Sequence, residues 1–421
     1  MALSYFLFFF WLIILSWLLA KIRFVKNAGL GLQVIIALFI CKVIAGLFSG
    51  WLAHGQPGSD SWFYHRSGLT EYRLLLSNPK EYFANFFYTG YSYGYGGFLN
   101  VQNSYWNDLK DNLIIKLLSV FDVFSGGNYY VNVVLYNFTI FFGHIGLYRV
   151  FDAMYRQHKL LTAAVVFLLP SVLFYSSAIH KDGLVLALIG VVVFNAWKIL
   201  EGGRWLPRRI IYIGLSLALV FFFRLFVFMA FVPPLMAWFW AQKKNMQPVK
   251  IFLAVYAVLI VLFFSTPYLS PSINLPVYMA KRQADFLLLK GNTTMPMDTL
   301  QPTPAGFAKA APQALQHGLL RPLLTDVKLS KMLLPLSIEL VFYELLVVAF
   351  FLWRQPGFSF NRPFVFFSLF FGLSLCLIIG YTVPVIGAIV RYRSIYLPFI
   401  IAPFALGIDW AKLGTFAGIK K

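Results

Sequence analysis

The segment Gly58–Arg66 carries a carboxylate and a phenol at helical spacing just beyond an apolar run. Asp60 stands a few residues past that run, where a carboxylate could act as a general base toward an acceptor hydroxyl. Tyr64 follows four residues later, on the same face of a helix that begins near Asp60. The alternative is that Asp60 is only the N-cap of this helix. Both interpretations stay open from the sequence.

A second polar cluster, His180-Lys181-Asp182-Gly183, follows directly on another apolar run. A lysine and an aspartate in a tight turn can bind a phosphate and orient it. The alternative is a solvated turn in which Asp182 caps the next helix and Gly183 permits the bend. Because His180 and Lys181 come straight after an apolar segment, we favour substrate binding by His180, Lys181 and Asp182.

Charged residues also interrupt apolar runs. Arg224 stands among phenylalanines, where its guanidinium either reaches the outer headgroups or binds an anion such as phosphate. Glu339 and Glu344 fall within one apolar run, and an ionisable residue in a bilayer is a functional hypothesis by default. Either glutamate could instead neutralise Arg224 or Lys42. We favour a site role for Glu339, which lies nearer the expected outer end.

The sequence Arg391-Tyr392-Arg393, with Pro398 shortly after, precedes the last apolar run. Two cations with an aromatic residue between them form a clamp suited to a lipid phosphate or pyrophosphate. We therefore expect Arg391 and Arg393 to contact phosphate. No cofactor is indicated, and a divalent metal has no support, because paired histidines on a helix face and cysteine clusters are missing from the sequence.

The composition is that of a membrane protein. Of 421 residues, 60% are hydrophobic and 12% charged, and the mean hydropathy is +0.74. Soluble domains run about 45–50% apolar and about 25% charged. The formal net charge of +20 would suit a nucleic-acid binder, but the cations mostly form short clusters between apolar runs. We expect membrane lipids as partners and no nucleic acid.

The fold class we expect is all-α, a polytopic bundle of about eleven transmembrane helices that makes up one integral membrane domain, residues 1–421. The expected spans are Ala2–Ala20, Leu30–Ala53, Tyr130–Tyr148, Leu160–Ser177, Leu184–Leu200, Ile210–Phe223, Leu225–Ala241, Ile251–Tyr268, Met332–Trp353, Phe364–Gly380 and Ile395–Trp410.

The charges between these runs set an orientation. With the basic segment after the first run inside the cell, every short inner loop is basic and most acidic residues fall outside. This predicts a multi-pass protein of the cell (inner) membrane with its N-terminus outside and its C-terminus in the cytoplasm. Two long loops, 54–128 and 269–330, then face outward. We expect an amphipathic helix around Asn112–Phe124 within the first loop.

This layout resembles the GT-C type of polytopic glycosyltransferase, which uses polyprenyl-phosphate-linked sugars on the outer side of the membrane. Asp60 lies in the first outer loop, where that superfamily places its catalytic acid. The Arg-Tyr-Arg of residues 391–393 is similar to a motif before a late span in bacterial relatives of the protein mannosyltransferases. The segment 170–182 also looks like one in membrane proteins of bacterial surface-polysaccharide clusters. One departure is that many members carry two adjacent acids where Asp60 is flanked by Ser59 and Ser61.

The resemblance implies transfer of a sugar from a polyprenyl-phosphate-linked donor to a glycan or lipid-linked acceptor, in surface polysaccharide or glycoconjugate assembly. Asp60 would be the base, with Arg391 and Arg393 on the phosphate. The alternatives are an O-antigen-type polymerase or ligase, and a carrier or flippase for a lipid-linked substrate. A flippase needs polar residues through the bundle, and the mainly apolar spans favour the enzyme. Aromatic residues of the first long loop could stack on sugar rings or instead anchor the loop at the membrane interface: Tyr88, Tyr91, Tyr93, Tyr95 and Trp106.

Overall fold

The computed structural model describes residues 2–56, 58–87, 105–156, 158–202, 207–244, 246–269, 273–289, 291–359 and 362–416. Within these ranges the regular structure is helical, apart from two isolated β-bridges, Thr294 with Val385 and Arg354 with Ile408. The chain forms two compact units. Unit 1 comprises Met1–Val150, Val166–Trp197 and Trp205–Leu225, and unit 2 comprises Phe151–Val165, Lys198–Arg204 and Phe226–Lys421.

Eight helices of the described residues are long and apolar enough to cross a membrane, and a bent pair makes a ninth candidate. The eight are α1 (Ala2–Lys21), α3 (Leu32–Ala53), α7 (Tyr129–Tyr155), α10 (Lys181–Gly202), α12 (Leu225–Lys244), α13 (Pro248–Leu269), α16 (Leu334–Leu352, with the turn before it) and α17 (Pro363–Thr382). The protein is therefore a helical, multi-pass membrane protein. The expected number of about eleven is not reached by these criteria.

The expected span Leu160–Ser177 is a broken element. It consists of α8 (Lys159–Ala163), a π-helical turn η2 (Ala164–Leu168) and α9 (Pro170–Ser177), with a bend of 54° between the two halves. Pro170 accounts for the break, because proline has no N–H for the preceding turn and favours the first position of a new helix.

The expected last span is also displaced. Helix α18 runs from Ile386 to Ala405, so Arg391, Tyr392 and Arg393 lie inside it and not in a loop before it. The hydropathy pattern predicts the boundary of an apolar run at these two cations. The helix accommodates them because the buried guanidinium of Arg393 donates to backbone carbonyls of a neighbouring segment.

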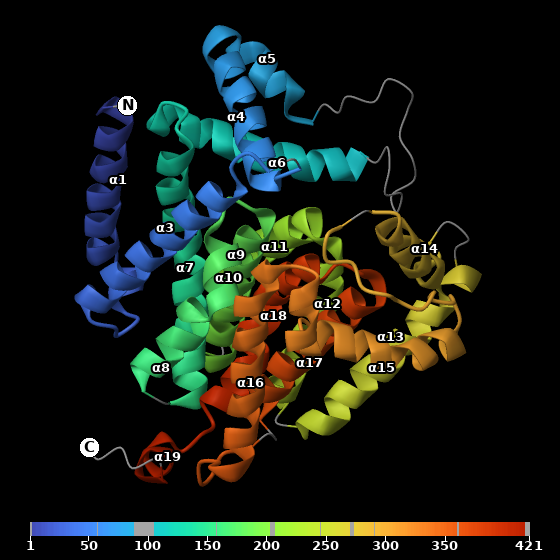
Figure 1. The fold of residues 1–421 in the computed structure, drawn as a ribbon. Coiled ribbons are helices and arrows are strands. Elements are labelled where there is room, and N and C mark those ends of the chain that lie inside the picture. Colours follow the sequence, from blue (N-terminus) through green and yellow to red (C-terminus); the bar gives the residue numbers. More distant parts are fainter. Residues whose placement is uncertain are drawn as a thin grey trace. The chain divides into compact units, whose positions relative to one another are not determined.

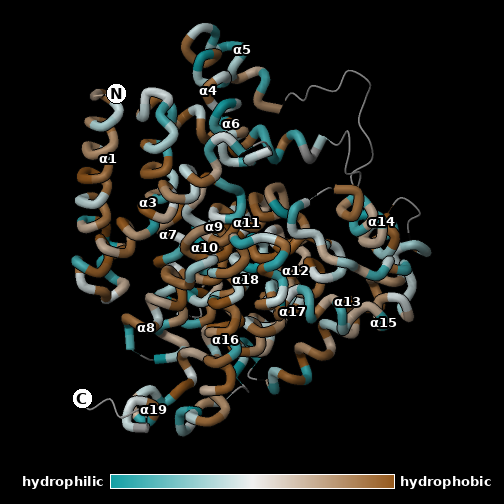
Figure 2. Tube along the Cα trace, viewed as in Figure 1, coloured by the Kyte–Doolittle hydropathy of each residue, from teal (hydrophilic) through white to brown (hydrophobic). Residues whose placement is uncertain are grey.

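Unit 1 contains long apolar helices, which are candidate membrane spans, and helices that are shorter or more polar. Its remaining elements are α2 (Arg23–Lys26), α4 (Asp60–Ser77), α5 (Pro79–Ala84), η1 (Asn85–Phe87), α6 (Tyr105–Ser125) and α11 (Pro207–Phe223). Figure 1 shows α6 running crosswise to α1 and α7, and Figure 2 shows that α4 and α5 carry more hydrophilic residues than α1. The helix expected around Asn112–Phe124 is part of α6, inside the predicted first outer loop.

Glycines set the distance between the helices of unit 1. A Cβ on Gly143 of α7 would lie 2.1 Å from the carbonyl oxygen of Ala187 in α10, and one on Gly190 would lie 2.1 Å from the carbonyl oxygen of Gly143. Small residues allow membrane helices to approach this closely, where packing and not the hydrophobic effect holds them together.

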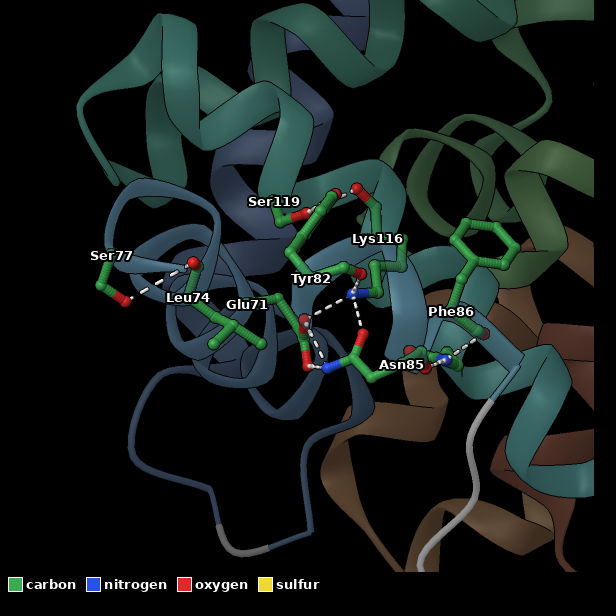
Figure 3. Close-up of polar contacts among 9 residues, drawn as sticks. Glu71, Leu74, Ser77, Tyr82, Asn85, Phe86, Lys116 and Ser119 are labelled. Carbon is green, nitrogen blue, oxygen red and sulfur yellow. Dashed lines mark hydrogen bonds and ion pairs between the residues drawn. The ribbon is translucent and has the colours of Figure 1, made fainter. Parts of the chain in front are cut away.

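A buried lysine ties α4, α5, η1 and α6 of unit 1 together (Figure 3). The Nζ of Lys116 in α6 donates to Glu71 Oε2 at 2.6 Å, to the carbonyl oxygen of Tyr82 at 2.8 Å and to Asn85 Oδ1, and it lies 3.7 Å from the centroid of the Tyr82 ring. The Tyr82 hydroxyl is 2.8 Å from Ser119 Oγ. These contacts fasten α5 and η1 to α4 and α6.

Unit 2 is built around aromatic side chains. Its further elements are α14 (Leu275–Leu287), α15 (Pro304–Leu320), η3 (Leu324–Lys328), η4 (Lys331–Leu333) and α19 (Trp410–Phe416). Phe231 and Trp238 of α12 pack against Phe367 of α17, and Phe371 packs edge-on against Phe399 of α18. The predicted second outer loop, 269–330, contains α14 and α15.

We predict that Lys116→Met lowers the free energy of unfolding by about 3–5 kcal/mol, because it leaves the Glu71 carboxylate and two further acceptors without their shared donor. Thermal unfolding of the purified protein in detergent measures this. Lys80→Met, which removes an exposed lysine of α5, is the control and should have little effect. Equal shifts for the two variants would contradict the prediction.

Candidate functional site

Five charged residues and a tyrosine from four separate stretches of unit 1 lie together. They come from the start of α4, the start of α6, the start of α10 and the junction between α11 and α12. We call this set the charge cluster: Asp60, Tyr64, Asp111, Lys181, Asp182 and Arg224. Five of these six are residues that the sequence analysis proposed, so the fold gathers most of the unit 1 candidates in one place.

Lys181 and Tyr64 converge on one oxygen of Asp111. The Lys181 ammonium forms an ion pair with Asp111 Oδ1, and the Tyr64 hydroxyl donates to the same oxygen at 3.1 Å. Lys181 Nζ also lies 5.2 Å from the centroid of the Tyr64 ring. The Lys181 side chain is 4% exposed and that of Asp111 is 37% exposed. The pair therefore consists of a buried cation and a carboxylate that reaches solvent.

Arg224 and Asp182 form the second ion pair. Arg224 Nε and Nη2 lie 2.9 and 2.8 Å from Asp182 Oδ1. Asp182 is fully buried in the first turn of α10, and the Arg224 side chain is 15% exposed. Arg224 occupies the single residue between α11 and α12. The anion that the sequence analysis sought for Arg224 is thus Asp182, and neither Glu339 nor Glu344 is needed for this role.

Asp60 is the first residue of α4, and the N-cap position before it belongs to Ser59. The alternative in which Asp60 is only the N-cap is therefore wrong. Asp60 acts electrostatically on Tyr64 and on Lys181. Burial raises the pKa of the Tyr64 hydroxyl well above its ordinary value, and the carboxylates of Asp111 and Asp60 raise it further. Tyr64 is therefore a neutral hydrogen-bond donor at physiological pH.

The turn before α10 is held against α7. The carbonyl oxygen of His180 accepts a hydrogen bond from the Tyr136 hydroxyl. A Cβ on Gly183 would lie 2.2 Å from the carbonyl oxygen of Ser176 and 2.4 Å from the Tyr136 hydroxyl oxygen. Gly183 is therefore required for close packing, and this packing places Lys181 and Asp182 at the cluster.

A buried polar group lies in α3, α7 and α9 of the same unit. Lys42 of α3 is fully buried, and its Nζ donates to Ser176 Oγ at 2.8 Å and Ser177 Oγ at 3.1 Å. The Asn137 amide donates to the carbonyl oxygen of Ser177 at 2.9 Å, and buried His144 interacts electrostatically with Lys42. These side chains make the interior of unit 1 more polar than the sequence analysis expected.

The predicted site residues of unit 2 have other surroundings. Arg393 is 2% exposed and its Nη1 donates to the carbonyl oxygens of Leu319, at 3.3 Å, and Arg321, at 2.7 Å. Arg391 is partly exposed and lies 5.9 Å from the centroid of the Tyr392 ring. Of the two, Arg391 is the more accessible to a ligand, while Arg393 holds α18 against the end of α15.

Glu339 also lies in unit 2, in α16, where it is buried and accepts a hydrogen bond from the Tyr343 hydroxyl one turn later. Asp60 belongs to unit 1, whereas Arg391, Arg393 and Glu339 belong to unit 2, and each unit is described separately. The expected meeting of these residues at one site therefore stays a prediction.

Sequence reasoning missed Asp111. It lies one residue before the segment Asn112–Phe124 that was expected to be helical, in a helix that starts at Tyr105. The signal in the sequence is that Lys181, next to an apolar run, needs an anion, and the first half of α6 carries two acidic residues, Asp108 and Asp111, three positions apart. Spacing along the chain did not indicate which carboxylate would supply the charge.

No group of three or more His, Cys, Asp or Glu side chains among the described residues is placed to hold a metal ion. The aromatic residues proposed to stack on sugars lie outside the part of the chain that is described: Tyr88, Tyr91, Tyr93, Tyr95 and the side chain of Trp106.

The chain matches no protein-family model, no curated protein and no solved structure. The resemblance to GT-C glycosyltransferases therefore stays a prediction from the motifs.

We predict that Arg224→Met destabilises the protein by about 3–5 kcal/mol, because it leaves the Asp182 carboxylate buried without its cation. The double variant Arg224→Met/Asp182→Asn should recover part of this loss, since both charges are then gone. Thermal unfolding of both variants, with Arg66→Met at an exposed position as the control, gives the comparison. A double variant no more stable than Arg224→Met would count against the pair.

Proposed function

We propose that this protein is a membrane glycosyltransferase, which moves a sugar from a polyprenyl-phosphate-linked donor to a glycan or lipid-linked acceptor on the outer side of the membrane. The observation that carries the proposal is the charge cluster, where carboxylates, a buried lysine, a partly buried arginine and a neutral phenol lie together at the starts of α4, α6 and α10 and the junction of α11 and α12. Transfer from a lipid phosphate needs both a base and stabilisation of the departing anion.

Asp60 is the base in this proposal. Asp182 is sealed from an acceptor by its full burial. Asp60 is half-buried at the start of α4 and close enough to act on both Tyr64 and Lys181. It takes the proton from the acceptor hydroxyl while the acceptor oxygen forms its bond to the anomeric carbon.

Lys181, Arg224 and Tyr64 serve the leaving group. As the bond between the anomeric carbon and the phosphate oxygen breaks, its electron pair stays with the phosphate. Two cations and a neutral hydroxyl donor are suited to stabilise that charge, and in a site with little water their effect is stronger than in solution. His180 contributes through the backbone that holds Lys181 in place.

Asp111 could supply the second carboxylate that is missing beside Asp60 in the GT-C pattern. Many members carry two adjacent acids in the first outer loop, whereas Asp60 has serine neighbours. In this protein α6 brings a second carboxylate to the same cluster from 51 positions further along the chain, the difference between 111 and 60. The same chemistry would serve an O-antigen-type polymerase or ligase.

A carrier of a lipid-linked substrate is the second candidate, and one observation favours it. The buried polar group of Lys42, Asn137, His144, Ser176 and Ser177 gives unit 1 polar side chains within its membrane-spanning helices. Polar residues in such helices often mark a transport path.

We predict that Asp60→Asn lowers sugar transfer by at least about a hundredfold, the usual contribution of a general base. The assay uses the purified protein in liposomes with a labelled polyprenyl-phosphate sugar and an acceptor. Glu81→Gln, which changes an exposed carboxylate of α5, is the control and should retain full activity. Full activity in Asp60→Asn, with unchanged thermal stability, would remove Asp60 from the mechanism.

Lys42→Met separates the two candidates. For a transferase we expect this variant to keep its sugar-transfer rate, since Lys42 lies outside the charge cluster. We also expect liposomes with the wild-type protein to move a fluorescent polyprenyl phosphate between leaflets no faster than protein-free liposomes. Rapid movement that Lys42→Met abolishes would establish the carrier and overturn the transferase proposal.

A further inference from the structure

The charge cluster contains one position where an anion is held by two donors and can still leave. Asp111 Oδ1 accepts from the Lys181 ammonium and from the Tyr64 hydroxyl. Both donors belong to buried residues, whereas the Asp111 side chain is 37% exposed. The Asp111 side chain is therefore partly exposed, while the Lys181 ammonium with which it pairs is buried.

The two ion pairs of the cluster differ in this respect. Asp182 is fully buried, so separating it from Arg224 would leave a buried carboxylate without its cation. Asp111 can turn toward solvent and regain water at little cost. Lys181 cannot, because its side chain is 4% exposed, so it requires another anion whenever Asp111 departs.

We propose that Asp111 is an internal substitute for a substrate phosphate: it occupies the anion position formed by Lys181 and Tyr64 until a phosphate group displaces it. This inference rests on the proposed function for the identity of the natural ligand, a polyprenyl-phosphate-linked donor. The site itself is defined by the two donors.

Charge explains why displacement, and not addition, is expected. The cluster holds three carboxylates, Asp60, Asp111 and Asp182, against two cations, Lys181 and Arg224, so its formal charge is 2 − 3 = −1. A phosphate that bound beside Asp111 would place a further anion in an already negative cluster. A phosphate that replaces Asp111 accepts from the same ammonium and hydroxyl, and Arg224 is near enough to act on both donor residues.

Asp111→Asn therefore should bind phosphate more tightly, because the amide competes less well for Lys181. We expect roughly tenfold tighter binding, which corresponds to loss of a competing contact of about 1.4 kcal/mol. Lys181→Met should abolish the binding, and Tyr64→Phe should weaken it. Glu81→Gln, at an exposed position of α5, should bind as the wild type does.

The experiment measures equilibrium binding of polyprenyl phosphate and of inorganic phosphate to the full-length protein in nanodiscs. Tighter binding of both probes by Asp111→Asn means that the phosphate group alone is recognised. Tighter binding of polyprenyl phosphate alone means that the lipid chain is required. Unchanged or weaker binding of both probes by Asp111→Asn overturns the proposal.

Two further measurements keep the inference testable and separate from the transferase. If Asp111→Asn folds poorly, Asp111→Ser replaces it, and phosphate should raise its melting temperature more than that of the wild type. A smaller or equal rise would contradict displacement. Binding is measured without turnover, so tighter binding by the Asp111 variant together with full transfer by Asp60→Asn would uphold the anion position and reject only the assignment of the base.

Discussion

The arrangement of unit 1 depends on the pairing of its buried cations with carboxylates. A buried ammonium or guanidinium is costly unless a carboxylate or several acceptors meet it. Lys116 meets Glu71, Lys181 meets Asp111 and Arg224 meets Asp182. Each pair joins segments far apart in the sequence. Together they fix α4 and α6, which are not among the candidate spans, to the helices that are.

Close packing makes these pairs reachable. The start of α10 can approach α9 and α7 only because residue 183 has no side chain, and α7 and α10 stay close at Gly143 and Gly190. A larger residue at Gly183 would push Lys181 and Asp182 away from the Tyr136 hydroxyl and from Ser176. The positions of the charged groups in the cluster thus depend on glycines, which have no functional group of their own.

The class of protein and most of its long helices could be predicted from hydropathy, because lipid requires long apolar helices with satisfied backbones. The prediction failed where charge was taken to end a helix. Arg393 lies inside α18 because carbonyl groups from the end of α15 accept its hydrogen bonds, and these are invisible in a hydropathy window. Asp111 was missed for a related reason: a carboxylate in an amphipathic helix looks like ordinary surface until the fold brings Lys181 to it.

A site for a lipid phosphate at the membrane edge faces two opposing requirements. Catalysis needs cations that are available to the substrate, whereas folding needs each buried cation to have a carboxylate or other acceptors when the substrate is away. Under the proposed function, the charge cluster would meet both requirements with carboxylates of different exposure. Asp182 is fully buried against Arg224, and this pair holds the fold together. Asp111 is partly exposed and pairs with buried Lys181. In the proposed site, Lys181 keeps a carboxylate partner when no substrate is bound, and only a ligand that can replace Asp111 gains access to it.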